Sequence, residues 1–279
     1  MTITTRDQLI AAMANNSSCI NIDKASISNA VANTYSSLWR ATGVPGQAAI
    51  PTTAATCDNT LLGSISFTQQ TSPATSYLGS LEGTCTNAAT TLEIHDRLMH
   101  MGGMVGNVTT SQTVNLDLNA NTGSDNLDLR KGASNFRDVA WWMEWYTDTG
   151  ATASNATINV TYNDATSGNL TVVAVGGTLR ASRMINLNAL IPSADSGKYI
   201  RDINTVILSA STGTAGNFGF TATRYKGGIY QPIANARFKE DWASLGIEEI
   251  QNECCLFPIQ SASTTTTGTV RATGKIIHG

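Results

Sequence analysis

Few residues of this chain have types and spacings that could support chemistry. His95, Asp96 and His100 form the one cluster of candidate metal ligands or catalytic groups in the sequence. The two histidines are five residues apart, so their imidazoles would diverge in direction on a helix and face opposite sides of a strand. We therefore interpret the three residues as part of a polar loop or an interface, rather than as a metal or catalytic site.

Motifs for nucleophilic catalysis and cofactor binding are missing. Ser80 stands in Gly79-Ser80-Leu81-Glu82-Gly83, which differs from the Gly-x-Ser-x-Gly of a nucleophile elbow. The glycines of residues 213–219 lie between two strand-like runs, which is typical of a hairpin turn and not of a dinucleotide site. The paired carboxylates of a glycosidase meet in space, so the sequence leaves them open. We expect a non-enzymatic protein with no catalytic residue, no metal and no cofactor.

The cysteines point to packing rather than to reactivity. The chain holds five, at scattered spacings: Cys19, Cys57, Cys85, Cys254 and Cys255. We interpret them as small buried hydrophobic residues. A Cys57–Cys85 disulfide stays open, although it would need an oxidising compartment. The N-terminus lacks the basic start and apolar run of a signal peptide, so we expect synthesis and folding in a cytoplasm.

The composition excludes several classes of protein. Charged residues make up 13% of the 279 residues, about half of the usual ~25%. With 41% hydrophobic residues and a net charge of −3, the chain is neither disordered nor equipped with a basic nucleic-acid-binding surface. No apolar run approaches the ~20 residues that cross a bilayer. The surface must owe its solubility to hydroxyl and amide groups.

We divide the chain into three regions, beginning with an N-terminal helical segment over residues 1–40. Thr5 and Gln8 have the spacing of a capping box, which predicts a helix over residues 5–14. Its apolar stripe is narrow and needs a partner surface; it consists of Leu9, Ile10 and Met13. A second, weaker helical pattern covers residues 26–38. Removal of residues 1–40 is expected to leave the β domain folded.

The second region, residues 41–110, is predicted to be an extended, loop-rich arm with short strands. Gly43-Val44-Pro45-Gly46 would break a helix, and little periodicity follows up to about residue 90. One short strand is predicted over residues 64–68. A loop region of this length is unusual within a compact domain, but it is ordinary in a protein that embraces a neighbour.

The third region, residues 111–279, is predicted to be an antiparallel β domain. Strand patterns recur every 10–15 residues without intervening amphipathic helices, which favours a jelly-roll-like β-sandwich over a parallel sheet. A hairpin loop is expected at residues 163–169, and a short helix over residues 234–245. The predicted strands are 114–118, 139–146, 157–162, 170–175, 179–187, 205–210, 218–225, 254–259 and 269–277.

Three tryptophans of the predicted strand over residues 139–146 need separate treatment. Trp141 and Trp145 alternate with Trp142, and share a face with Val139 and Met143. A sandwich buries such a face, and buried tryptophan contributes strongly to a core. We interpret the two residues as core; a protein interface and a sugar-binding surface remain as alternatives.

Several segments resemble families of tailed-bacteriophage virion proteins, from about residue 36 to residue 224. The segments are Ser36–Gly46, His95–Gly103, Ser111–Leu118, Glu144–Gly150 and Leu208–Phe220. None of them is a motif with a mechanism, so the resemblance implies no active site. It implies a particle component encoded with the head and neck genes.

This resemblance implies a structural role in the virion, most simply as a capsid-associated cement or decoration protein that bridges neighbouring subunits. The expected partners are the major capsid protein or other virion proteins, with a homo-oligomer (a trimer favoured), no specific nucleic acid and no membrane. A neck or tail protein and a receptor- or sugar-binding adhesin remain as alternatives. The candidate interface residues are Leu9, Ile10, Met13, Trp39, Arg40, Val44 and Pro45.

Overall fold

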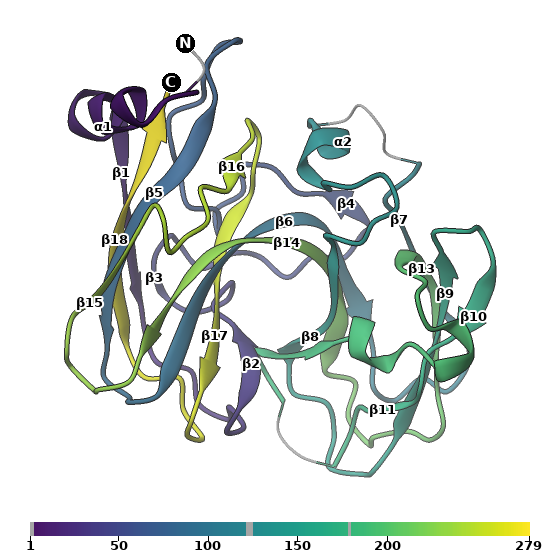
Figure 1. The fold of residues 1–279 in the computed structure, drawn as a ribbon. Helices are drawn as coiled ribbons and strands as arrows, with labels where there is room; N and C mark the ends of the chain where they lie inside the picture. Colours follow the sequence, from purple (N-terminus) through teal and green to yellow (C-terminus); the bar gives the residue numbers. More distant parts are fainter. Residues whose placement is uncertain (1–2, 121–124, 178–179) are drawn as a thin grey trace. The chain divides into compact units, whose positions relative to one another are not determined.

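The computed structural model describes residues 3–120, 125–177 and 180–279. The chain folds mainly into antiparallel β-strands with a short N-terminal helix, as the sequence predicted (Figure 1). Among these residues, no helix is long and apolar enough to span a bilayer. In chain order the elements are α1 (Arg6–Asn15), β1 (Ser17–Lys24), β2 (Thr34–Ser37), β3 (Gly43–Val44), β4 (Ala55–Thr56), β5 (Ser76–Cys85), β6 (Thr90–Met104), β7 (Gln112–Asp117), α2 (Leu127–Arg130), β8 (Ala140–Thr147), β9 (Asn155–Tyr162), β10 (Ser167–Asn169), β11 (Val173–Ala174), β12 (Arg183–Asn186), the 3₁₀ turns Asn188–Leu190 and Ser193–Asp195, β13 (Ile200–Leu208), β14 (Asn217–Gln231), β15 (Phe238–Asp241), β16 (Glu249–Ile250), β17 (Leu256–Ala262) and β18 (Val270–His278).

The predicted capping box forms at the start of α1. The Gln8 N–H donates to Thr5 Oγ1 at 3.3 Å, and the Thr5 N–H donates to Gln8 Oε1 at 3.1 Å. These bonds satisfy donors that the first helical turn leaves without an intrahelical partner. The helix therefore begins at Arg6 and ends at Asn15, within a residue of the predicted bounds.

The chain forms two compact units, each assembled from separated segments. Unit 1 comprises Met1–Ala49, Asp58–Asp96 and Tyr225–Gly279. Its six-stranded sheet has the order β15-β5-β18-β1-β3, with β16 also paired to β5. A second layer contains β2, β17 and the unit's portions of β6 and β14, and a shared hydrophobic core takes side chains from both layers. Unit 1 is therefore a β-sandwich.

Unit 2 comprises Ile50–Cys57 and Arg97–Arg224 and is also a β-sandwich. Its five-stranded sheet has the order β10-β9-β13-β7, with β11 paired to β9. The facing layer is built around β8, which pairs with β12 on one side and with β14 on the other. Their side chains, together with those of β6, enclose a second core that is rich in aromatic residues.

Strands β6 and β14 are fifteen residues long and contribute to both units. In each strand the middle residues are buried on both faces, as seven consecutive residues from Ile94 to His100 and six from Phe218 to Thr223. Continuous burial removes the alternation by which a half-buried strand is recognised in a sequence. This explains why residues 41–110 were predicted to carry only short strands. That prediction is wrong, because β5 and the whole of β6 lie there.

Two predicted helices are absent from the structure. Within residues 26–38 the chain forms β2, and positive φ angles of 68° at Asn29 and 62° at Asn33 are incompatible with a continuing helix. Within residues 234–245 the chain forms β15, whose Phe238 pairs with Gly83 and packs against the core of unit 1. Tertiary strand pairing overrides the helical spacing of the apolar residues in both segments.

The predicted strand over residues 64–68 is also wrong, since no strand is assigned there; the Ile65 N–H donates to Leu256 O at 2.7 Å. Removal of residues 1–40 would not leave the β fold intact, because it would delete β1. That strand pairs with β18 along all eight residues and places Ile20 and Ile22 in the core. The three-region division itself stays a prediction.

The remaining predicted strands are found, with shifted ends. A hairpin forms after β9, but the paired strand β10 (Ser167–Asn169) lies wholly inside the predicted loop, and only Val173–Ala174 (β11) of the predicted strand 170–175 pairs with β9. The strand predicted over residues 179–187 corresponds to β12 (Arg183–Asn186). Residue 179, where the prediction begins, lies outside the described residues. Turn chemistry sets these ends, as where Asp164 Oδ1 accepts from the Thr166 N–H at 3.0 Å.

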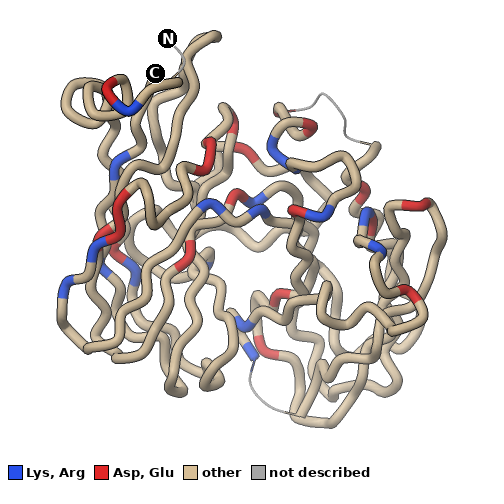
Figure 2. The backbone as a smooth tube through the Cα atoms, viewed as in Figure 1, with Lys and Arg blue, Asp and Glu red and all other residues tan. Residues whose placement is uncertain are grey.

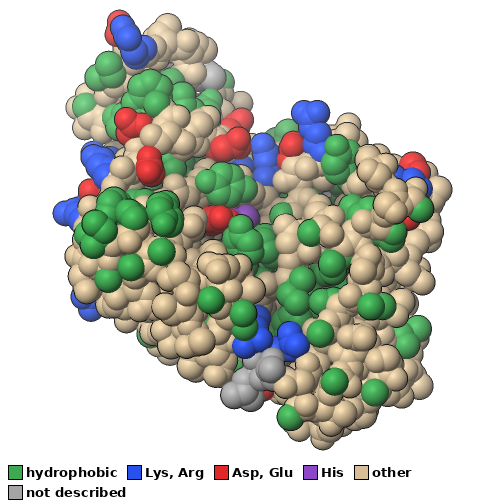
Figure 3. Space-filling view, turned by 60° about the horizontal axis from the view of Figure 1, so that its bottom comes forward, with side chains coloured by type: hydrophobic (Ala, Val, Ile, Leu, Met, Phe, Trp, Pro, Cys, Tyr) green, Lys and Arg blue, Asp and Glu red, His purple; other side chains and the backbone are tan. Residues whose placement is uncertain are grey.

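Charged side chains are sparse on the folded chain. Figure 2 shows Lys, Arg, Asp and Glu thinly distributed along the strands, with both signs interspersed. On the face drawn in Figure 3, backbone and neutral polar side chains cover most of the surface between small hydrophobic patches. This agrees with the inference that hydroxyl and amide groups keep the surface solvated.

The interpretation of Trp141 and Trp145 as core residues is confirmed. Both side chains are fully buried in the core of unit 2, together with Val139 and Met143. Trp141 Nε1 donates to Ile200 O at 2.9 Å, so its polar atom is satisfied inside the sandwich. The opposite face of β8 is buried as well, with Trp142 and Glu144 in the interior.

We expect Trp145→Ala to lower the free energy of unfolding by about 3–5 kcal/mol, because it removes a large side chain from a close-packed core. Ile207→Ala serves as the control, since Ile207 is 43% exposed on β13 of the same unit. It should change the stability by less than about 0.5 kcal/mol. Urea unfolding followed by circular dichroism measures both values. Equal midpoints for the two variants would contradict the core assignment.

Candidate functional site

The outer face of the six-stranded sheet in unit 1 is the surface best organised for binding. Along β1, Ile20 and Ile22 point into the core, while Cys19, Asn21 and Asp23 are exposed. The strand register places these exposed side chains in rungs across β1, β18 and β5. The two rungs nearest β3 are Asp23–Arg271–Thr84 and Asn21–Thr273–Glu82.

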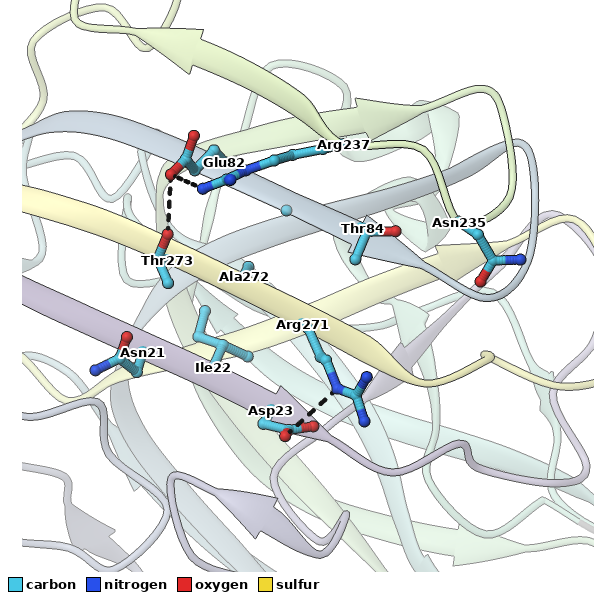
Figure 4. Close-up of a pocket in the computed structure, with 11 residues that line it drawn as sticks. Asn21, Ile22, Asp23, Glu82, Thr84, Asn235, Arg237, Arg271, Ala272 and Thr273 are labelled. Carbon is cyan, nitrogen blue, oxygen red and sulfur yellow. Dashed lines mark hydrogen bonds and ion pairs between the residues drawn. The ribbon is translucent and has the colours of Figure 1, made fainter.

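These two rungs line a shallow polar groove of about 410 Å³ (Figure 4). Arg237, from the loop before β15, forms an ion pair with Glu82. Thr273 Oγ1 donates to the same Glu82 carboxylate at 3.2 Å. At the other end of the groove, Arg271 Nε lies 3.6 Å from Asp23 Oδ2. The close-up shows these two sets of side chains on neighbouring strands of one sheet surface.

The groove is suited to polar binding. Exposed ion pairs of this kind contribute roughly 0–1 kcal/mol to stability, so their groups can exchange partners with a bound molecule at small cost. Arg271 and Asp23 are 71% and 57% exposed, which leaves both accessible. The lining offers carboxylates, guanidinium groups, amides and hydroxyls, and its two acidic and two basic residues balance in charge. Such a surface favours a polar partner without a strong net charge.

Helix α1 covers the other end of the same sheet face. Leu9 and Ala12 pack on Ile277 of β18, with Tyr77 of β5 at the edge of this small cluster. A β-bulge at Gly79 brings Tyr77 opposite Ile277. A Cβ atom at Gly79 would lie 2.9 Å from Ile277 Cγ2, so a larger residue would push the strands apart. The apolar stripe of α1, which is predicted to need a partner surface, therefore packs in part against this sheet.

The structure brings five of the seven predicted interface residues to this sheet. On α1, Leu9 is buried and Met13 packs beside it, whereas Ile10 is 57% exposed. On edge strand β3, Val44 is 52% exposed and lies directly opposite Asp23 of the groove. Ile10 and Val44 are therefore the members that reach solvent.

The carbonyl group of Pro45 accepts a hydrogen bond from a buried lysine, Lys24. Lys24 Nζ donates to Pro45 O at 2.6 Å and to Ala41 O at 3.0 Å, and its side chain is fully buried. Burial lowers the pKa of Lys24 to about 8. The ammonium group thereby fixes the chain on either side of β3 against β1.

The other two predicted interface residues lie elsewhere. Trp39 is buried, and its ring makes an edge contact with Phe257 at 5.8 Å. Arg40 is half-buried, and its Nη1 donates to Ala48 O at 2.7 Å. Trp39 therefore has an internal packing role, which corrects the expectation that it is directly available to a partner.

His95, Asp96 and His100 lie on β6, and all three are buried. The polar-loop interpretation is therefore wrong. Asp96 belongs to the interior of unit 1, where its carboxylate accepts from the Cys255 N–H at 2.9 Å and from Cys254 Sγ at 3.1 Å. The described residues contain no group of three or more His, Cys, Asp or Glu residues that could hold a metal ion.

None of the five cysteines, all of which the structure describes, forms a disulfide. Cys57, Cys85, Cys254 and Cys255 are buried, as predicted, whereas Cys19 is exposed on the outer sheet face. The Cys57–Cys85 disulfide left open by the sequence is not formed. The prediction of burial is therefore wrong for Cys19 alone, because Cys19 alternates with Ile20 on the outward side of β1.

Unit 2 contains a buried ion pair on the second face of its β8 layer. Arg97 Nη2 donates to Glu144 Oε2 at 2.7 Å, and both side chains are fully buried. Thr221 Oγ1 donates to the same oxygen at 2.7 Å, and Tyr146 Oη at 3.2 Å. Burial alone would lower the pKa of Arg97, but the charge of Glu144 raises it overall, so Arg97 stays protonated. These contacts hold polar side chains within a layer buried on both faces.

A pair of acidic groups lies across β7 and β13 of unit 2. Asp117 and Asp202 are cross-strand partners, and their carboxyl groups share a hydrogen bond. Burial raises the pKa of Asp202 to about 6; Arg201, which donates to it at 2.8 Å, opposes this shift, and the charge of Asp117 adds to it. Burial would raise the pKa of Asp117 too, but hydrogen bonds from Asp202 and two backbone N–H groups hold it below its usual value. The pair therefore binds one proton near pH 6.

Sequence reasoning missed the groove residues Glu82, Arg237 and Arg271. The alternation of charged and apolar residues along the predicted strand 269–277 was a usable signal for Arg271. Glu82 and Arg237 are separated by 155 positions, and no local pattern joins them. Only the pairing of β5 with β15 brings them together.

The chain matches no protein-family model and no curated protein. Among solved structures it is similar to the VP2 subviral particle of infectious bursal disease virus, with 10% identity, 94% of this chain and 79% of that chain covered, and a TM-score of 0.18. The structure of the Gt strain of the same virus gives 10% identity, coverage of 94% and 81%, and a TM-score of 0.18. The T13 particle of that virus gives 9% identity, coverage of 95% of this chain and 78% of that chain, and a TM-score of 0.16. Likeness at these TM-scores carries no argument, so the function must be inferred from the site.

We expect the stability of the protein to fall as the pH rises through 6, because of Asp202. Its folded pKa of about 6 exceeds the ordinary value of 3.8, so its contribution is complete below pH 3.8 and lost above pH 6. Asp202→Asn should raise the free energy of unfolding at pH 8 by roughly 1–2 kcal/mol and flatten this part of the profile. Urea unfolding at several pH values measures the effect.

Asp23→Asn is the matched control, because Asp23 is 57% exposed on the sheet of unit 1. It should leave the pH profile unchanged. If Asp202→Asn follows the parent profile at every pH, the shared proton does not exist.

Proposed function

We propose that this chain is a non-enzymatic structural component of a tailed-phage particle, most simply a capsid-associated cement or decoration protein. In this role it bridges neighbouring subunits of the major capsid protein and lies in the virion. The resemblance of segments between residues 36 and 224 to virion protein families supports the proposal. The sparse surface charge and the mainly β fold agree with it.

The observation that carries the proposal is the grouping of α1, the polar groove and β3 on one sheet of unit 1. The predicted interface residues lie between positions 9 and 45 of the sequence. The two exposed residues, Ile10 and Val44, lie at the two ends of this sheet. Ile10 and Val44 supply apolar contact, while Asp23 and Arg271 between them supply polar contact. Protein interfaces combine apolar and polar contacts, and this face offers both kinds.

A cement protein acts by mass action. By binding the assembled shell and not its separate subunits, it stabilises the shell in proportion to the free energy of its contacts. We propose a homotrimer or a lattice-bound form, with interfaces well above the ~1,000 Å² that distinguishes biological contacts from most crystal contacts. A sheet face suits this role because strand pairing already fixes its backbone, so it loses little conformational entropy on binding.

The second candidate is a receptor- or sugar-binding adhesin, or a neck or tail protein. The groove favours the adhesin, because carboxylate, amide and guanidinium groups on one surface can form several hydrogen bonds with sugar hydroxyls. The ten described side chains labelled in Figure 4 include no aromatic ring on which a sugar could stack. This leaves the structural role as the better supported of the two.

We expect Val44→Lys to abolish or weaken particle binding by at least about tenfold, since an ammonium group would be buried in the proposed contact. The folded chain should tolerate it, because Val44 is 52% exposed and faces Asp23. Val172→Lys is the control, because the Val172 side chain is similarly exposed, at 54%, but lies in unit 2. Co-sedimentation with purified particles that lack the protein measures binding.

Particles without the protein should form but rupture at a lower temperature, and the parent chain should restore their heat resistance. Val172→Lys should restore it too, whereas Val44→Lys should not. If particles that lack the protein are fully heat-resistant but fail to adsorb to cells, the adhesin replaces the cement protein.

A further inference from the structure

A second surface of unit 1 lies on the layer formed by β2, β17, β6 and β14. On β6, Leu92 and Ile94 point into the core, so Glu93 and His95 point to the opposite side. Tyr225 of β14 is 48% exposed, and its ring meets the His95 ring edge-on, with centroids 5.5 Å apart. The layer thus presents an accessible aromatic ring beside a carboxylate.

Glu93 is the centre of this surface. Its Oε2 lies 2.9 Å from His95 Nε2, and it accepts a hydrogen bond from the Tyr35 hydroxyl of β2. A Cβ atom at Gly228 would lie 3.3 Å from Glu93 Cγ and 3.2 Å from the Tyr225 hydroxyl oxygen. Both groups therefore close over Gly228, which has no side chain to separate them. We call Tyr35, Glu93, Tyr225 and Gly228 the tyrosine–glutamate surface; the Glu93 side chain is 16% exposed, and the buried His95 packs against this surface.

The electrostatic surroundings of this surface are acidic. Burial raises the pKa of Tyr225, and the next largest effects come from Glu93, Glu240 and Glu248, all of which also raise it. The pKa of Tyr35 is raised by burial and by Glu93. Three carboxylates from separate parts of the chain therefore act on one half-exposed phenol ring. The negative potential adds to that of the ring face, which is itself attractive to cations.

From these contacts we infer that the tyrosine–glutamate surface docks a basic side chain, arginine or lysine, presented by a partner protein. The cationic group would lie against the Tyr225 ring, with its charge directed to Glu93. A planar guanidinium can stack on a ring and donate to a carboxylate at once, so arginine is the better fit. Phosphate and carboxylate ligands would be repelled. This inference is independent of the proposed function, because it concerns a different sheet.

The experiment uses the full chain and short synthetic peptides as probes. One peptide carries two arginines between glycines, a second carries lysines, and a third carries citrulline, which keeps the shape of arginine without its charge. A neutral fluorophore on each peptide allows fluorescence anisotropy at low salt and at about 300 mM salt. We expect the arginine and lysine peptides to bind at low salt, the citrulline peptide to bind at least about tenfold more weakly, and salt to weaken both charged peptides.

Two variants test the assignment, with two matched controls. Glu93→Gln keeps the shape of the side chain and should weaken arginine-peptide binding by about tenfold, and Tyr225→Ala by roughly threefold to thirtyfold. Tyr225→Phe retains the ring and should keep most of the affinity, which separates ring loss from misfolding. Tyr230→Ala removes a tyrosine that is 54% exposed on the same strand, and Asp7→Asn removes one charge from α1. Both controls should bind like the parent.

Three outcomes would overturn the inference. The first is equal binding of the citrulline peptide, and the second is a loss in Asp7→Asn as large as that in Glu93→Gln. The third is the absence of any binding of the arginine peptide to the parent chain. None of these outcomes would affect the role proposed for the outer sheet face, which is tested by Val44→Lys.

Discussion

Strands β6 and β14 each supply side chains to two separate hydrophobic cores, and the rest of the fold depends on this double use. Where a strand is buried on both faces, every polar side chain on it needs an internal partner. Arg97 and Glu144 satisfy this requirement for each other, with Thr221 and Tyr146 completing the contacts. Removing one member of such a buried pair typically costs about 3–5 kcal/mol, because the other charge is left unpaired. The pair therefore fixes which side chains of β6, β8 and β14 face each other.

The same arrangement leaves the outer face of the six-stranded sheet free. In unit 1 the inward side chains of β1, β5 and β18 fill the core, and the outward side chains that α1 does not cover carry no packing requirement. That face can be polar and nearly neutral, as Asp23, Glu82, Arg237 and Arg271 make it. A protein with few charged residues thus places some of them in buried pairs and others on an exposed sheet face. The proposed structural role follows from the second group.

The sequence was informative for most strands with one buried face, although it missed β1, whose exposed and buried side chains alternate from Cys19 to Lys24. Alternation located β7, β9, β13 and β18, and the Trp141–Trp145 face was assigned to the core correctly. It failed on β6, where residues 94–100 are buried without alternation, and it also missed β5. It also failed on β15, where the spacing of Phe238 fits a helix but pairing with β5 decides the structure. The groove could not be predicted, since Glu82 and Arg237 meet only through long-range strand pairing. The division into units was equally hidden, because each unit is discontinuous in sequence.

The two edges of the six-stranded sheet have a consequence for aggregation. One edge is β3, which has only two residues and is followed directly by Pro45, a residue without a backbone N–H to donate. The other is β15, four residues long and carrying Lys239, Glu240 and Asp241. Short, charged or proline-blocked edges are poor templates for a further strand. Neither edge strand is therefore a good template for edge-to-edge pairing between copies of this chain, which favours association of unit 1 through the face of this sheet, where contacts can form and dissociate reversibly.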